Sequence, residues 1–282
     1  MLSLHFLNVG KGNCTIIDFP SSRISMIDID NSRIKDDDEE LTDPIDFYSK
    51  KFTDRSLFRF ILTHPDMDHL SGFDELVKKI NISNLWDTKH NRTFSDSDWE
   101  NSPYNRNDWD TYLRLRGKTE NPKWITPLRG ETSDCCWTQD NIKILSPSAS
   151  LVEMSDSTGE YNHLSYVLMI EHAGVKIMLS GDASMETWDD IVDKYGTESL
   201  KADIFLAPHH GSKNCIHEEA FKAIDPSFVI VSVVKKVDYD YEYYSKLARK
   251  QVLSTKYYGN IKIDINDDGS YLPIIVEKNG GK

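Results

Sequence analysis

The amino-acid sequence predicts a single α/β domain in which two β-sheets pack between two layers of helices, an αββα sandwich. Strand-like runs open the chain and return after its middle, and in each half they are followed by apolar residues at helical spacing. Two sheets that each bury one face against the other and one face against helices satisfy this order. The 282 residues, 39% of them hydrophobic, suffice for one substantial core, and we find no internal repeat.

The first half is expected to form four strands and one helix. Turn-forming glycine, proline and serine residues separate its first three apolar runs, and a fourth apolar run of strand length precedes a polar loop. Apolar residues three and four positions apart then indicate a helix. The predicted strands are 2–9, 14–19, 24–29 and 58–62, and the predicted helix covers 73–80.

From about residue 87 to residue 134 the apolar periodicity is lost. This segment is rich in Asn, Asp, Ser, Thr, Arg and Trp. We therefore expect an irregular insertion or lid between the two halves.

The second half returns to strands and helices. Ala173 and Gly174 are expected to close a hairpin, and Ser184 can cap a helix that Gly196 ends. The predicted strands are 142–145, 164–171, 175–179, 204–206, 228–233 and 271–276, and further helices are predicted around 218–224 and 243–252.

Composition predicts a soluble cytoplasmic protein. No run approaches the roughly 20 apolar residues of a membrane span, and the first residues lack the features of a signal peptide. The four cysteines lack the spacing of a disulfide framework, so we expect reduced thiols, with 135–136 an incidental pair in a loop. The net charge of −13 argues against broad electrostatic attraction to nucleic acid, and the acidic run 36–40 is expected to be a solvated loop.

Four potential metal ligands lie within six residues directly after a predicted strand. In an extended segment His64, Asp66 and Asp68 share one face, and a bend into the next helix can bring His69 beside them. The alternative is a solvated loop whose acids cap the helix. Two further strand ends favour the metal site, because Asp182 follows one and the tandem His209 and His210 follow another.

The order HxDxDH, GD and HHGS resembles the metallo-β-lactamase superfamily, and in particular its ComEC-type branch of competence DNA-uptake proteins. Residues 6–13 resemble the opening signature of that branch, and 162–168 resemble its N-x-x-S strand before the GD motif. The resemblance covers nearly the whole chain. It implies two divalent metal ions, with ligands His64 and Asp66 for the first, Asp68, His69 and His210 for the second, Asp182 between them, and His209 as a further ligand or a neighbour.

The chain departs from the superfamily pattern in three places. Asp66 stands where the second histidine is usual, and the histidine of the third motif has no clear equivalent. His163 is the nearest candidate ligand, with a strand-edge role as the alternative. Asn8 and Asn13 replace acids of the opening signature, although Asn13 can still hydrogen-bond near the site. Asp28 and Asp30 are expected to support the site or its turns rather than bind metal.

The resemblance implies hydrolysis by a water that bridges two cations about 3.5–4 Å apart, with its pKa lowered towards about 7. Asp68, Asp182 and His210 would be catalytic through the metals, and Lys213 could neutralise a phosphate oxygen. Asn162 and Ser212 could donate hydrogen bonds to the substrate, and simple loop solvation is the alternative for these three polar side chains. Zn²⁺ or Mn²⁺ is expected, with Mg²⁺ possible, because Asp66 makes the first site richer in oxygen.

A phosphodiesterase or nuclease, most simply a DNase, is the favoured function. The stretch 235–258 interleaves basic residues with tyrosines and could bind a nucleic-acid strand, although helical amphipathicity also explains it. A protein partner such as an ATPase in an antiviral defence complex is a further expectation. The alternatives are a hydrolase of a small ester, cyclic nucleotide or lactone, and a metal-binding interaction protein that has lost its chemistry.

Overall fold

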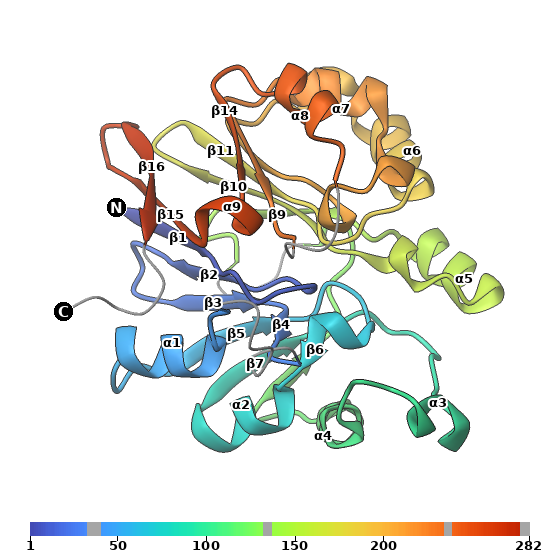
Figure 1. Cartoon of the computed structure of the whole chain (residues 1–282). Coiled ribbons are helices and arrows are strands. Elements are labelled where there is room, and N and C mark those ends of the chain that lie inside the picture. The colour runs from blue at the N-terminus through green and yellow to red at the C-terminus, as the bar shows by residue number, and fades with distance from the viewer. Residues whose placement is uncertain (33–40, 132–136, 234–238, 277–282) are drawn as a thin grey trace.

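The computed structural model of this chain describes residues 1–32, 41–131, 137–233 and 239–276. Two sheets face each other, and helices cover the outer face of each (Figure 1). The predicted αββα sandwich is therefore confirmed. The acidic run 36–40 and the cysteine pair 135–136 lie outside the described residues, and the other two cysteines, Cys14 and Cys215, are buried free thiols.

The first sheet has eight strands and contains both ends of the described chain. Its antiparallel part runs from the C-terminal hairpin to β3, and its remaining strands are parallel. In spatial order the strands are β16 (Tyr271–Val276), β15 (Asn260–Ile265), β1 (Leu2–Phe6), β2 (Thr15–Asp18), β3 (Ile24–Ile27), β5 (Leu57–Ile61), β7 (Ile82–Trp86) and β8 (Lys123–Ile125). A small parallel pair, β4 (Ile29–Asp30) and β6 (Leu70–Ser71), lies beside the sheet.

The second sheet has six strands. Its first four are parallel, and the last two complete an antiparallel meander. In spatial order they are β14 (Gln251–Ser254), β13 (Phe228–Val231), β12 (Ile204–Leu206), β11 (Val175–Leu179), β10 (Val167–His172) and β9 (Ile142–Ser146).

Helices line the two outer faces. On the first sheet lie α1 (Pro44–Lys51), α2 (Phe73–Lys79) and α4 (Arg106–Leu115), with α3 (Asp96–Glu100) nearby; on the second lie α6 (Met185–Tyr195), α7 (Glu218–Ile224) and α8 (Tyr241–Leu247). Two others, α5 (Ala149–Thr158) and α9 (Thr255–Tyr258), lie in connections. Short 3₁₀ helices occupy Met67–His69, Tyr161–Leu164, Thr197–Ser199, His209–Gly211 and Lys213–Cys215. No helix in the described ranges is long and apolar enough to cross a membrane.

The alternation of side chains along the strands builds three apolar layers. In β2, Ile17 points between the two sheets, whereas its neighbour Ile16 points towards the helices of the first sheet. The third layer packs α6, α7 and α8 onto the second sheet. Because both faces of the central strands are buried, their sequences are almost continuously apolar.

Local signals in the second half are confirmed. The side chain of Ser184 accepts a hydrogen bond from the backbone N–H of Thr187 at the start of α6, and Gly196 at its end has φ of 70°. Ala173 and Gly174 both have positive φ and close the β10–β11 hairpin.

The segment 87–134 is more regular than predicted. It contains α3, α4 and β8, and Trp109, Tyr112 and Leu115 of α4 are buried on the α2 side of the first sheet. Asn105 caps α4, and the buried Trp109, Tyr112 and Leu115 recur three residues apart, so a local helical signal was present in the sequence. The prediction missed it because the polar composition of the whole segment was given more weight than this pattern.

The end of the chain also differs from the prediction. The helix expected over 243–252 ends at Leu247, β14 follows it, and β15 was not predicted. Earlier in the chain, α1, β7 and α5 were also missed, so the expectation of four strands and one helix for the first half was wrong. β14 gains its order from hydrogen bonds to β13, which is a partner distant in sequence.

Candidate metal centre

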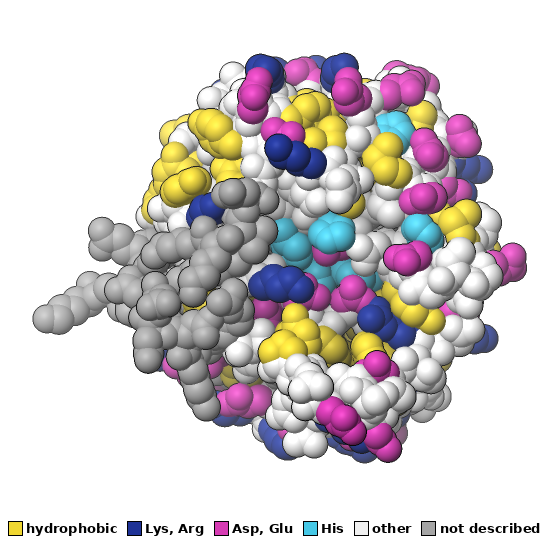
Figure 2. Space-filling view, turned by 45° about the vertical axis from the view of Figure 1, so that its right-hand side comes forward, with side chains coloured by type: hydrophobic (Ala, Val, Ile, Leu, Met, Phe, Trp, Pro, Cys, Tyr) yellow, Lys and Arg dark blue, Asp and Glu magenta, His cyan; other side chains and the backbone are white. Residues whose placement is uncertain are grey.

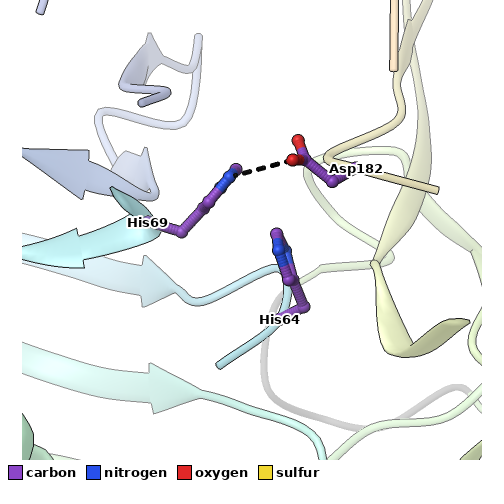
Figure 3. A group of neighbouring side chains, drawn as sticks. All are labelled: His64, His69 and Asp182. Atoms are coloured by element: carbon purple, nitrogen blue, oxygen red, sulfur yellow. Dashed lines mark ion pairs between the residues drawn. The ribbon is translucent and has the colours of Figure 1, made fainter. Parts of the chain in front are cut away.

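Loops at the carboxyl ends of strands from both sheets converge on one group of side chains. His64 follows β5, His69 lies in the 3₁₀ helix Met67–His69, and Asp182 follows β11. These three point towards one another in Figure 3, and their ligand atoms lie within 4.8 Å of one another. Asp68, His69 and His210 form a second group by the same measure, so His69 belongs to both.

The Asp182 carboxylate lies between two of the imidazoles. Its Oδ2 atom is 3.3 Å from Nε2 of His69 and 3.4 Å from Nε2 of His210. Nε2 of His210 is also 3.9 Å from Oδ2 of Asp68. The sequence-predicted Asp68, His69, Asp182 and His210 are therefore brought together, and Asp182 occupies the central position.

Three histidine nitrogens in this cluster lack hydrogen-bond partners in the described part of the chain. They are the buried Nε2 atoms of His64, His69 and His210. Each has a carboxylate oxygen 3.3–3.6 Å away but forms no hydrogen bond to it, and buried polar atoms are nearly always hydrogen-bonded, so a cation shared by these groups would satisfy them. Imidazole nitrogens together with carboxylate oxygens are the donor set of Zn²⁺ and of related divalent cations, and the residues therefore fit a metal centre.

The opposite ring nitrogens are held by hydrogen bonds that aim Nε2 into the cluster. His69 Nδ1 lies 2.7 Å from Oδ2 of Asp28, and Nδ1 of His64 lies 3.0 Å from Oγ1 of Thr63. Asp28 also accepts hydrogen bonds from the backbone N–H and hydroxyl of Thr63, each at 2.8 Å. Such supporting contacts fix the tautomer and orientation of metal-binding histidines. Asp28 thus supports the site, as expected.

The GD and HHGS loops are held to each other and to the N-x-x-S segment. Ser165 Oγ accepts a hydrogen bond from the backbone N–H of Asp182, and the backbone N–H of His209 donates to the carbonyl of Gly181. His209 and His210 have φ of 48° and 56°, a left-handed conformation that is uncommon for histidine. Motifs that are distant in the sequence are therefore neighbours at one edge of the sandwich.

Burial and mutual charge set the protonation of the cluster before any cation binds. Burial, with His69 beside it, lowers the pKa of His64 to about 4. Burial also opposes charge on His69, but Asp182 and Asp28 outweigh it and raise the pKa of His69 well above its usual value. The pKa of Asp182 is held well below its usual range, because His69 and His210 outweigh the effect of burial.

Three of the predicted ligands lie outside the two compact groups. Asp66 forms an ion pair with Arg92 and lies 3.6 Å from Nε2 of His64, measured from its Oδ2. Nδ1 of His163 lies 2.7 Å from Oγ of Ser184, at the start of α6. His209 Nδ1 is 3.3 Å from both Asn162 Nδ2 and Cys215 Sγ.

The predicted substrate-binding residues lie around the HHGS loop. Asn162 contacts His209, as given above, and Ser212 Oγ accepts a hydrogen bond from the backbone N–H of Asn214. Lys213 is exposed in the same turn. In the stretch 235–258, residues 235–238 lie outside the described residues, and Tyr239, Tyr241, Tyr257 and Tyr258 line a cavity of about 440 Å³.

Two basic side chains that the sequence analysis did not select lie beside the acids. Lys11 Nζ is 3.2 Å from Oδ2 of Asp68, and Arg92 pairs with Asp66. Lys11 is part of the opening signature and lies between two glycines, so the sequence could have indicated that it is near the site. Nothing in the sequence around Arg92 indicates such a position. Figure 2 shows the histidines gathered in the middle of one face, with acidic and basic side chains next to them. Asn13 donates a hydrogen bond to Asp182 at 3.4 Å, as expected.

The two-sheet sandwich with this cluster at its edge is the metallo-β-lactamase fold. The fold protein YhfI from Bacillus subtilis aligns with a TM-score of 0.52 and 10% identity over 96% of this chain and 99% of that one. A long form of RNase Z from yeast aligns with a TM-score of 0.44 and 13% identity over 96% of this chain and 41% of that one.

The sequence is similar to a ComE operon protein, which is consistent with the ComEC-type motifs. ComE operon protein 3 of Bacillus subtilis (strain 168) is 25% identical over 213 residues, which are 74% of this chain. The match covers 24% of that protein, so the chain spans about a quarter of the length of this relative. No family model matches the chain.

Proposed function

We propose that this chain is a metal-dependent hydrolase that holds two divalent cations and cleaves phosphodiester bonds. The observation that carries the proposal is the convergence of three buried histidine nitrogens, none of which forms a hydrogen bond to a described residue, on the carboxylates of Asp68 and Asp182. A divalent cation would satisfy these nitrogens and the carboxylates together.

The cluster offers ligands for two cations. His64 and Asp66 would hold one, with Asp66 exchanging its ion pair with Arg92 for the cation, and Asp68, His69 and His210 would hold the other. Asp182, which lies beside His69 and His210, would contribute to both. When bound, the cations would supply an activated water and would offset the negative charge that develops on the substrate. The carboxylate share of this set favours Mn²⁺ or Mg²⁺ more than an all-histidine site would, with Zn²⁺ the other candidate.

The basic residues next to the cluster favour a phosphodiester over an uncharged ester. Lys11 and Arg92 lie beside Asp68 and Asp66, and Lys213 follows the HHGS loop. Cationic side chains beside the ligands can bind the non-bridging oxygens of a phosphate and orient it for attack. Lys11 and Arg92 pair with Asp68 and Asp66, so they offset part of the acidic charge at this place in a chain whose net charge is −13.

The test is cleavage of labelled single- and double-stranded DNA and RNA with Mn²⁺, Mg²⁺ or Zn²⁺. The wild type is compared with an Asp68→Ala/His69→Ala double variant, and metal content is measured in parallel. His172→Ala/Asp267→Ala is the matched control, because it removes an exposed histidine–aspartate pair outside the cluster. We expect metal-dependent cleavage that only the Asp68/His69 variant loses, together with its bound metal.

Other outcomes would replace the proposal with its alternatives. Hydrolysis of a small ester or lactone without any cleavage of nucleic acid would assign a small-molecule hydrolase. Bound metal without any hydrolysis would indicate an interaction protein. Cleavage that begins only when a partner ATPase is added would support the expected larger complex.

A further inference from the structure

A cavity of about 260 Å³ opens beside the proposed metal ligands. Asp66 and Asp68 border it on the side of the metal cluster, and Phe94, Trp99 and Tyr104 border it on the side of the segment 87–134. In Figure 2, hydrophobic side chains lie directly next to the histidine cluster and its charged neighbours. A small molecule bound in this cavity would contact both the metal site and an aromatic wall.

The aromatic wall is tied into the core. The ring of Phe94 packs edge-on against Trp99, with centroids 5.1 Å apart, and against Trp109, with centroids 4.7 Å apart. Trp109 is 3% exposed and belongs to the apolar layer below the first sheet. Phe94 and Trp99 are only partly buried, so each keeps some ring surface free in the described structure. A preformed aromatic surface binds flat ligands at little entropic cost.

Two cationic side chains, Lys11 and Arg92, lie between this wall and the carboxylates of Asp66 and Asp68. Lys11 Nζ lies 3.2 Å from Asp68 and its side chain is 54% exposed. The guanidinium of Arg92 stacks 4.7 Å from the Phe94 ring centre and 4.9 Å from that of Tyr161. Stacking holds the guanidinium plane in place, which suits it to paired contacts with phosphate oxygens.

The aromatic wall, the cationic side chains of Lys11 and Arg92 and the metal cluster lie next to one another in space. This arrangement matches the parts of one nucleotide. We propose that the cavity binds the base of the nucleotide adjacent to the scissile phosphate, and that the substrate is a single-stranded or frayed nucleic acid. This inference rests on the proposed function and deepens it.

The size and chemistry of the cavity set the kind of strand. Its volume is below the roughly 300–1,000 Å³ of sites for drug-sized ligands, so it has room for one base rather than a stacked run. A base can reach such a wall only after it leaves its pair and its stack, which is easiest in single strands and at ends.

The first experiment compares hydrolysis of the dinucleotide dApdA with that of an analogue whose bases are replaced by hydrogen. Trp99→Leu keeps an apolar side chain on Phe94 but removes the stacking ring, and Trp99→Phe restores a ring. We expect Trp99→Leu to raise KM for dApdA about tenfold with a smaller change in kcat, Trp99→Phe to remain within about twofold, and the analogue to be insensitive to either variant. Leu272→Ala, which removes an exposed apolar side chain on β16 outside this cavity, is the control.

A second measurement separates this inference from the proposed hydrolase. Binding of dAMP and of deoxyribose 5-phosphate is followed by tryptophan fluorescence and calorimetry in wild type and Trp99→Leu. Binding that requires both the base and Trp99 supports the cavity even if no phosphodiester is hydrolysed. Equal hydrolysis of dApdA and its analogue, or dAMP binding that is unchanged in Trp99→Leu, would overturn the assignment of this cavity as the base site and leave the proposed hydrolase standing.

Discussion

Oδ2 of Asp28 lies 2.7 Å from Nδ1 of His69, and this contact aims the opposite nitrogen of the ring into the metal cluster. Asp28 itself adopts φ of 57° at the end of β3 and is held by two hydrogen bonds from Thr63. The loop that carries the ligand and the strand end that orients it are thus one unit. The function of this unit can be tested by substituting Asp28 while the candidate metal ligands stay unchanged.

Asp28→Asn should lower the affinity for divalent cations by about 10- to 100-fold, because supporting carboxylates contribute this much at comparable sites. Isothermal titration with Mn²⁺ and Zn²⁺ measures the change. Asp18→Asn, which breaks a surface pair with Arg55 near the far end of the same sheet, should leave the affinity unchanged. An unaltered affinity in Asp28→Asn would remove Asp28 from the support of the site.

Two histidines that the sequence placed among the candidate ligands should behave differently. His64→Gln should lose at least tenfold in metal affinity, because its buried Nε2 faces the cluster. His163→Gln should retain metal within about twofold, because its Nδ1 is turned to Ser184 and the residue lies outside both compact groups. Equilibrium dialysis with metal analysis compares the two. A larger loss in His163→Gln would make His163 the missing third-motif ligand.

Gly12→Ala should weaken both the fold and the metal site. A Cβ atom at residue 12 would meet the backbone carbonyl oxygen of Asp68 and would lie 2.5 Å from Cβ of Asp30, so the loop with Asp68 must move. We expect a loss of about 1–3 kcal/mol in the free energy of unfolding, measured with urea, together with weaker metal binding.

Gly117→Ala is the matched control for this effect. Gly117 has φ of 77° but no atom within 4 Å of its added Cβ, so the substitution introduces backbone strain of about 1–2 kcal/mol without a clash. Metal affinity should be unchanged in this variant. If Gly12→Ala also left metal affinity unchanged, the close approach of Gly12 to Asp68 would have no role in the site.

Stability should fall on acidification partly through His90. Burial, with Arg116 nearby, lowers the pKa of His90 from 6.5 to about 3, and its neutral ring pairs with the Tyr112 hydroxyl at 2.8 Å and the Arg92 backbone N–H at 3.1 Å. Between these two pKa values the unfolded chain binds a proton that the folded chain does not. The stability that His90 contributes is therefore present above pH 6.5 and is lost as the pH falls towards about 3.

Urea unfolding at several pH values measures this contribution. The difference in unfolding free energy between wild type and His90→Gln should shrink on acidification below pH 6.5, by up to about 1.4 kcal/mol per pH unit. His172→Gln, in an exposed pair with Asp267, is the control. Parallel pH profiles for wild type and His90→Gln would show that His90 titrates alike in both states.

The segments that carry the candidate metal ligands were recognisable in the sequence because their information is local. His64, Asp66, Asp68 and His69 lie in six consecutive positions after a strand, and strand ends are where α/β sites collect. The positions of Lys11 and Arg92 were not predictable in the same way, because each reaches the acids from a different loop. Whether Asp66 faces a metal or an arginine depends on the path of the segment 87–134.

The sequence by itself determined the αββα architecture, the order of the ligand motifs and the turns and caps of the second half, since alternation, glycines and caps act over a few residues. Only the tertiary structure decided that Asp182 lies between His69 and His210, and that the Phe94–Trp99 wall stands beside the cluster. These relationships depend on packing between residues far apart in the chain. Such packing stabilises helices and strands whose own sequences are ambiguous.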